Sequence, residues 1–141
     1  MSIAPQSIFR GTDCELYMEG KWLTNMTAAE ATVEINQAEL NLLGNFWTQY
    51  RNMGLAGSGT LTGVFVNTEL IEKIGSIQSG KEFRTEVVIK NYNPDSNKTY
   101  RVRLKNIIFS AIPLGNFTAG EIAEVEFPFV FSGYEILDKV K

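Results

Sequence analysis

The sequence predicts a mainly β fold, either a β-sandwich or an incomplete barrel with one flanking α-helix. Apolar and polar residues alternate with a period of two in several segments, which is typical of half-buried strands. One segment, over about residues 68–79, follows the helical period instead. The chain has 141 residues, of which 44% are hydrophobic and 11% aromatic, so it can bury one core and we expect a single domain over residues 1–141.

The alternating segments place the strands along the chain. Two of them flank the turn sequence PDSN and predict a hairpin. Another predicts a tight hairpin that turns at Glu19-Gly20. The segments that we interpret as strands cover residues 15–23, 31–37, 60–66, 82–92, 99–105 and 123–131.

The predicted helix would cover one face of the sheet. Apolar residues recur in it at helical spacing, Asn67 or Thr68 can cap its start, and Gly80 can end it. We expect its apolar stripe to meet the inward faces of the last strands. The predicted core residues are Leu70, Ile74, Ile77, Val102, Leu104, Phe127, Phe129 and Phe131.

The composition argues against an enzyme. The chain has no histidine, which removes Ser-His-Asp and Cys-His nucleophile systems and histidine-based zinc sites. Cys14 is the single cysteine, so no disulfide can form within the chain. We therefore expect no cofactor and no metal. No apolar run approaches the roughly 20 residues of a membrane span, and the N-terminus does not resemble a signal peptide, so we expect a soluble protein folded in the cytoplasm.

The glycine-rich stretch at residues 53–67, MGLAGSGTLTGVFVN, comes close to a phosphate-binding loop. Gly54 and Gly59 have the Walker A spacing, but Thr60 stands where the phosphate-binding lysine belongs. An alternating strand follows, so no helix N-terminus is available for an anion. We therefore expect these glycines to supply permissive backbone angles at the foot of a strand.

A basic row on one strand face suggests a second class of function. Arg101, Arg103 and Lys105 alternate to one side, and Tyr92 and Tyr100 are available for base stacking. A small β-barrel binding module for single-stranded nucleic acid is therefore the alternative function. The net charge of −3 and the acidic excess after residue 105 favour a solvated face that is paired with acids.

Residues 41–59 are too glycine-rich for a helix and too apolar for an idle loop. We predict an extended loop over about residues 44–59 that contacts a partner, because interfaces are enriched in aromatic, methionine and arginine side chains. The candidate interface residues are Phe46, Trp47, Tyr50, Arg51, Met53 and Leu55.

Four segments, LYMEGKW, VEINQAELNLLG, GLAGSGTLTGVFVN and EVEFPFVFSGYEIL, occur in an order that resembles the tail tube proteins of contractile phage tails and phage-tail-like bacteriocins, of the PBSX prophage type. The resemblance spans most of the chain. It departs from the family at NFWTQY, where a more polar and basic loop is expected.

The resemblance implies a structural protein that assembles with itself into rings of six subunits, and rings that stack into a tube. Its implied partners are a tail sheath protein and the baseplate and terminator proteins, with DNA only as passing cargo in a phage. The protein would be made in the bacterial cytoplasm and end in a virion or a released tail-like particle. The glycines would then end an extended arm that reaches a neighbouring subunit. We expect a neutral or acidic tube interior, because a basic wall would retain DNA.

Overall fold

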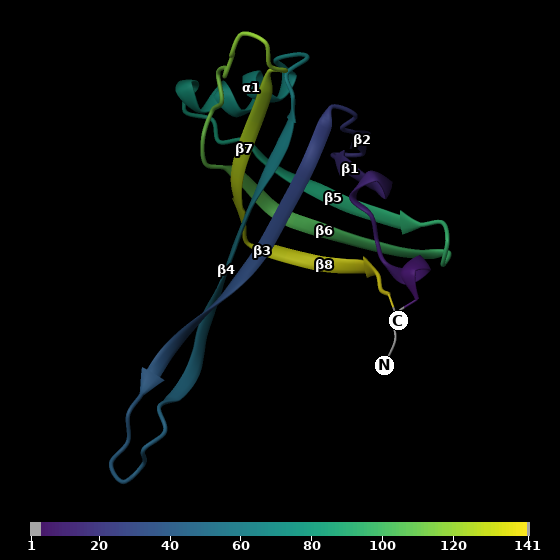
Figure 1. Ribbon diagram of the computed structural model, residues 1–141. Coiled ribbons are helices and arrows are strands. Elements are labelled where there is room, and N and C mark those ends of the chain that lie inside the picture. Colours follow the sequence, from purple (N-terminus) through teal and green to yellow (C-terminus); the bar gives the residue numbers. More distant parts are fainter. Residues whose placement is uncertain (1–3, 141) are drawn as a thin grey trace.

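The computed structural model describes residues 4–140, and strands dominate this range (Figure 1). A single antiparallel sheet contains eight strands, and the one α-helix of the described range is short. The elements are β1 (Cys14–Met18), β2 (Lys21–Trp22), β3 (Met26–Leu40), β4 (Gln49–Val64), α1 (Glu69–Ile74), β5 (Arg84–Asn93), β6 (Lys98–Phe109), β7 (Glu124–Phe131) and β8 (Gly133–Asp138), with 3-10 turns at Pro5–Ser7, Gly11–Asp13 and Gly75–Ser79.

The sheet folds over on itself at β6. The strand order is β2-β1-β5-β6-β7-β4-β3, and β8 pairs with β6 outside this path. Residues 101–105 of β6 pair with β8, whereas Ile108 and Phe109 pair with β7. Between them Asn106 has a positive φ of 54°. In Figure 1, β3, β4 and β7 cross steeply over β5, β6 and β8, as in orthogonally packed sheets. The predicted sandwich or incomplete barrel is confirmed.

The core lies between the two crossing parts of the sheet. Phe129 is 2% exposed, and its ring meets the rings of Phe109 and Phe131 with centroids 6.2 and 6.1 Å apart. Leu70 of α1 is half-buried and packs against this cluster. The buried apolar residues are Leu16, Met18, Leu61, Ile74, Val87, Val102, Leu104, Ile107, Val125, Phe127, Phe129 and Phe131.

Ile77 differs from its predicted core position, because it is 56% exposed. The α-helix ends at Ile74 and continues as a 3-10 turn until Gly80, which has a φ of +82°. The tighter 3-10 winding changes the angle between successive side chains and ends the α-helical stripe. Ile77 consequently lines a surface cavity with Phe83 instead of joining the core.

The glycines of β4 serve a different purpose from the expected one. None of those in β4 has a positive φ, so backbone freedom does not explain them. Gly57 pairs with Phe131, and Gly59 pairs with Phe129, across the β4–β7 ladder. A Cβ at Gly57 would lie 2.5 Å from Phe131 Cε2, and one at Gly59 would collide with the ring of Phe129. These glycines make room for the aromatic rings of the core.

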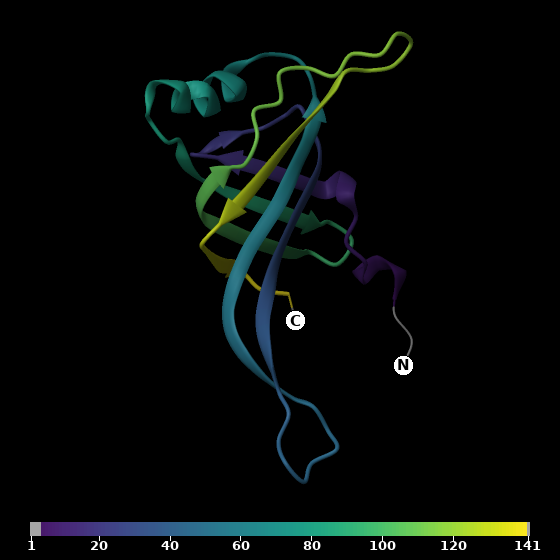
Figure 2. The ribbon, with the colours of Figure 1, turned by 90° about the vertical axis from the view of Figure 1, so that its left-hand side faces the viewer.

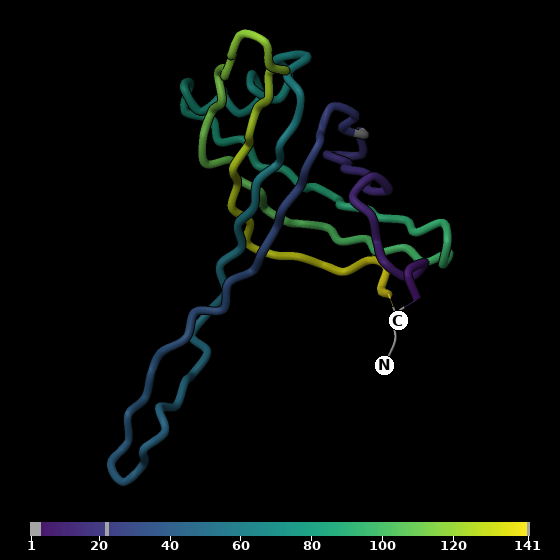
Figure 3. Tube along the Cα trace, in the orientation of Figure 1, coloured from purple at the N-terminus to yellow at the C-terminus, as the bar shows by residue number. Residues whose placement is uncertain are grey.

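A long hairpin extends away from the body of the protein (Figures 1 and 3). β4 pairs with β7 only over residues 57–64, and over residues 49–56 it pairs with β3 alone. We call residues 34–56, which include the connecting loop 41–48, the arm. The predicted loop over 44–59 is therefore wrong in its extent, because the chain is already in β4 from Gln49 onward.

Candidate assembly surfaces

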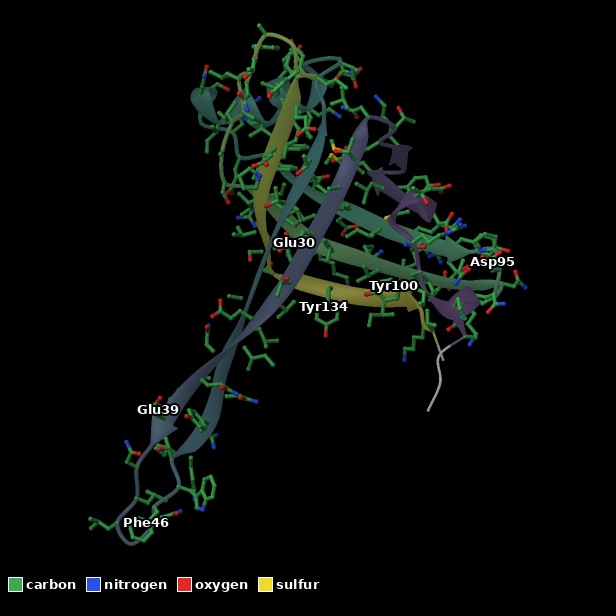
Figure 4. All side chains as sticks on the ribbon, in the orientation of Figure 1. Glu30, Glu39, Phe46, Asp95, Tyr100 and Tyr134 are labelled. Atoms are coloured by element: carbon green, nitrogen blue, oxygen red, sulfur yellow. The ribbon has the colours of Figure 1, made fainter. Side chains whose placement is uncertain are left out.

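The arm exposes an unusual number of large apolar side chains. At its end, labelled in Figure 4, Phe46 is fully exposed and Trp47 is 83% exposed. Large contiguous apolar patches on a single chain mark interaction sites. Its exposed apolar residues are Ile35, Leu40, Leu42, Leu43, Phe46, Trp47, Tyr50, Met53 and Leu55.

The arm continues the core face of the sheet without any layer to cover it. On β4, Leu61 is completely buried, and the same face continues through Gly59 and Gly57 to Leu55. Leu55 pairs with Ile35 on β3, yet these side chains are 70% and 51% exposed. An apolar sheet face therefore extends beyond the protein's own core, and a second protein surface is needed to bury it.

The connecting loop has hydrogen bonds of its own. The backbone N–H of Trp47 donates to Asn45 Oδ1 at 2.9 Å, and Thr48 Oγ1 donates to Asn41 Oδ1 at 3.2 Å. Gly44 has a φ of +79°, which glycine adopts without strain. Polar side chains thus bond within the loop, while its apolar side chains are exposed.

All six predicted interface residues lie on the arm. Tyr50, Met53 and Leu55 are 59–70% exposed, and Arg51 is exposed beside them. Sequence reasoning missed Ile35, which belongs to the opposite strand of the same hairpin. The signal that would have found it is the strand pairing of 31–37 with the segment that we expected to be a loop.

The basic row of β6 is matched by acids on both neighbouring strands. Arg101 Nε lies 3.1 Å from Asp138 Oδ2 in an ion pair without hydrogen-bond geometry. Arg103 lies 3.2 Å from Glu135 on β8 and 3.9 Å from Glu86 on β5. Lys105 approaches Glu135 at 3.4 Å. These exposed pairs add little stability, but they cancel the local positive charge.

Of the two tyrosines considered for base stacking, Tyr92 lies on the basic face and is 40% exposed, whereas Tyr100 does not lie on that face. Tyr100 is half-buried and packs against the core, on the side of β6 away from the arginines. The hydroxyl of Tyr92 donates to Asn97 Oδ1 at 2.7 Å. The basic face therefore has one of the two tyrosines beside basic side chains that are already paired, and this weakens the support for the alternative of a nucleic-acid module.

Two titratable side chains of β1 have raised pKa values. Cys14 is half-buried, and burial together with Glu15 raises the pKa of its thiol. A hydrogen bond to Glu15 raises the pKa of Tyr17. Within residues 4–140 there is no group of three or more His, Cys, Asp or Glu side chains placed to hold a metal ion. The described part of the chain also has no helix long and apolar enough to cross a bilayer.

Comparison with known proteins gives a consistent result. A family model described as "Phage tail tube protein" matches residues 1–138. The chain is 24% identical to the Phage-like element PBSX protein XkdM of Bacillus subtilis (strain 168), over 99% of this chain and 97% of that protein. It is also 24% identical to the uncharacterized protein YqbM of the same organism, over 100% and 98% of the two chains.

Solved structures show the same fold at lower identity. A chain in the tube-terminating cap of the anti-feeding prophage has a TM-score of 0.76 and 16% identity, with 99% of this chain and 97% of that chain covered. A chain in the sheath-tube complex of the PVC extracellular contractile injection system has a TM-score of 0.74 and 14% identity, with coverage of 96% and 95%. The SPP1 tail tube has a TM-score of 0.69 and 10% identity, with coverage of 95% and 81%.

Proposed function

The chain belongs to the phage tail tube protein family, and from this premise we propose that it assembles into hexameric rings that stack as the inner tube of a contractile phage tail or a phage-tail-like bacteriocin. Family membership makes it a structural protein of a tail tube. The six-fold ring, the stacking and the contractile particle are the proposal. Structural neighbours in sheath-tube, baseplate and terminator assemblies support a sheath protein, baseplate proteins and a terminator as partners.

The observation that carries the proposal is the uncovered core face of the arm. Burial of a leucine or isoleucine side chain contributes about 1.5–3 kcal/mol, so leaving Ile35, Met53 and Leu55 in water forgoes several kcal/mol. An isolated two-stranded hairpin is also only marginally stable in water. A neighbouring subunit that covers this face removes both costs, and a ring provides such a neighbour for every arm.

Open strand edges offer a second contact between subunits. β3 pairs only with β4, and β8 pairs only with β6, so each leaves one side of its backbone without a ladder partner. Long free edges promote uncontrolled association unless they are paired. Pairing between the edges of adjacent subunits closes the ring and gives the backbone groups of these edges ladder partners.

Pro128 on β7 fits this scheme. Its carbonyl accepts the backbone N–H of Ser110, which ends the pairing between β6 and β7. The proline nitrogen faces the same side as its carbonyl, where the ladder stops, so its missing N–H breaks no bond of the β4–β7 ladder. The proline is therefore accommodated within the chain.

The charge pairs of β6 suit a channel wall. If this face lines the tube, its basic side chains already have acidic partners, and few counterions would be released when DNA approaches. We therefore expect a neutral or acidic interior that holds cargo weakly. The protein would be made in the bacterial cytoplasm and end in a virion or a released tail-like particle.

Removal of the arm tests the proposal. In the variant, residues 35–55 are replaced by Asn-Gly, a two-residue turn that joins the paired residues Glu34 and Ala56. All fully buried core residues are retained, so we expect a folded monomer by circular dichroism and sedimentation. Negative-stain microscopy of the wild-type protein should show rings and tubes, and the variant should show neither.

The matched control keeps the arm and changes a side chain outside its apolar face. Asn36→Ser alters an exposed polar side chain on the face of β3 opposite to Ile35, and rings and tubes should persist. Ring formation by the armless variant would refute the role of the arm. A wild-type protein that stays monomeric at high concentration would refute the proposed function.

A further inference from the structure

The ladder between residues 34–40 and residues 49–56 of the arm contains an extra residue. Asn36 of β3 pairs with Gly54, and the next residue, Gln37, pairs with Asn52. Met53 of β4 is therefore left without a partner opposite. Such a β-bulge bends the strand that carries it and increases the local right-handed twist. The two ribbons of the arm cross over one another in Figures 1 and 2, as strongly twisted hairpins do.

The bulge separates two exposed apolar surfaces of the arm. On the side of the body, Ile35 and Leu55 pair across the hairpin and are 51% and 70% exposed. On the other side lies the connecting loop 41–48, and between the two surfaces Gln37 and Asn52 form a polar pair. We call Ile35 and Leu55 the inner patch, and Leu42, Leu43, Phe46 and Trp47 the end patch. The bulge thus sets the angle between the inner patch and the end patch.

This angle is held from both sides. Toward the body, β4 continues into residues 57–64, which pair with β7 as well as with β3. Toward the connecting loop, four further pairs follow, from Gln37 with Asn52 to Leu40 with Gln49. Directly beyond the bulge, Gln37 Nε2 donates a hydrogen bond to Asn52 Oδ1 at 3.0 Å. The extra residue therefore makes a fixed bend rather than a hinge.

We propose that the bulge at Met53 is a positioning element, which aims the end patch so that both patches meet a second copy of this chain at the same time. The inference rests on the proposed function, in which another subunit covers the arm. It assigns the positioning to the backbone of Met53, because the extra residue makes the bend. The side chain of Met53 contributes apolar area only.

The dimensions of the arm make this angle decisive. Five residues separate Met53 from Thr48, which is about 16 Å of extended chain. A change in direction of about 20°, the size of the usual twist between adjacent strands, would move the end of the arm by about 5 Å. Apolar side chains touch only within about 4–4.5 Å, so one patch would lose its contact when the other keeps it. Linked contacts lose their joint affinity when geometry forbids both at once.

Two deletions remove the bulge and leave a regular ladder. Without Met53, Asn36 still faces Gly54 and Gln37 still faces Asn52, so every side chain stays on its own side of the hairpin. Without Gly54, Met53 takes its place opposite Asn36, so the thioether side chain is retained. The matched control is Met53→Ala, which keeps the extra residue and truncates its side chain.

Spin labels measure the direction of the arm in the unassembled chain. In a Cys14→Ser background, labels at Phe46→Cys and Asp95→Cys occupy exposed sites that lie far apart in Figure 4. A second pair of labels, at Phe46→Cys and Glu121→Cys, detects movement in another direction. At low protein concentration, at least one label distance should change by about 5 Å in each deletion variant. Met53→Ala should leave both distances as in the wild type.

Assembly provides the second measurement. Both deletion variants should give the circular dichroism spectrum of the wild type and form no tubes in negative-stain microscopy. Met53→Ala should still form tubes, although a higher protein concentration is expected because apolar area is lost. Tubes of wild-type appearance from either deletion variant, or unchanged label distances, would overturn the inference.

The remaining outcomes are also decisive. Loss of tubes in Met53→Ala would assign the effect to the side chain and overturn the role of the backbone. Failure of both deletion variants to fold would show that the extra residue serves the folding of the hairpin instead. A wild-type protein that forms no rings refutes the proposed function, whereas the label distances test the bend by themselves, so the two failures are distinguishable.

Discussion

The two glycines that face aromatic rings on β4 should respond differently when the rings are removed. The three atoms nearest to a Cβ added at Gly57 all belong to the Phe131 ring, at 2.5–2.7 Å. A Cβ added at Gly59 meets the Phe129 ring and also the backbone carbonyl of Glu30. Truncation of the ring therefore frees the first position, whereas the second remains blocked by backbone that cannot rotate away.

The magnitudes follow from the overlap. Gly57→Ala alone should destabilise by about 1–3 kcal/mol, as overpacked core positions do. Phe131→Ala alone should cost about 3–5 kcal/mol. In the Phe131→Ala background, Gly57→Ala should instead stabilise by about 0.5–1 kcal/mol, because glycine is unfavourable within a strand. The coupling free energy between the two substitutions is then about 1.5–4 kcal/mol.

Urea unfolding followed by far-ultraviolet circular dichroism measures these free energies. Several protein concentrations are needed, because self-association adds to the apparent stability. The matched cycle of Gly59→Ala with Phe129→Ala should leave Gly59→Ala destabilising in both backgrounds. If Gly57→Ala costs the same with and without the Phe131 ring, the packing argument for this glycine is wrong.

Three further predictions concern single sites. Asn106→Gly should keep or raise the melting temperature, and Asn106→Val should lower stability by about 1–2 kcal/mol, because its φ is +54°. Asn93, 2% exposed, donates to the Gln6 carbonyl at 2.8 Å, so Asn93→Ala should cost about 1–3 kcal/mol in urea unfolding and speed tryptic cleavage of the N-terminal segment. The hydrogen bond from Lys21 lowers the pKa of Glu69, so Lys21→Met should raise the pKa of Glu69 in an NMR titration. The small stabilisation from this pair should be lost as the pH falls through the pKa of Glu69 in the folded protein.

The sequence predicted well those strands that bury one face. The segments 99–105 and 123–131 alternate cleanly because one side of each meets the core, and their buried residues were identified from that pattern. The hairpin at Glu19-Gly20 and the stop at Gly80 were also predicted, since both glycines require a positive φ. Local chemistry determines these features, so it is visible in a short window of sequence.

The arm could not be predicted in the same way. Between Gln49 and Ala56 both faces of β4 are exposed, so no alternation marks the strand, and the glycines there suggested a loop. The reason for Gly57 and Gly59 lies on β7, about seventy residues later in the chain. Ile77 was misplaced because the change from α to 3-10 winding after Ile74 leaves no sequence signal of its own.

β4 is a single strand that runs from Leu61, in the centre of the core, to Gln49, at the base of the connecting loop 41–48. A force applied to the tip along the arm axis is therefore transmitted directly to the interior. Because the ladder bonds to β7 run perpendicular to the strand, such a pull loads residues 57–64 in shear, with all of the bonds bearing the load together. The arm is therefore anchored in the body through the ladder of residues 57–64, and it should resist a pull along its axis far better than a loop attached at a hinge would.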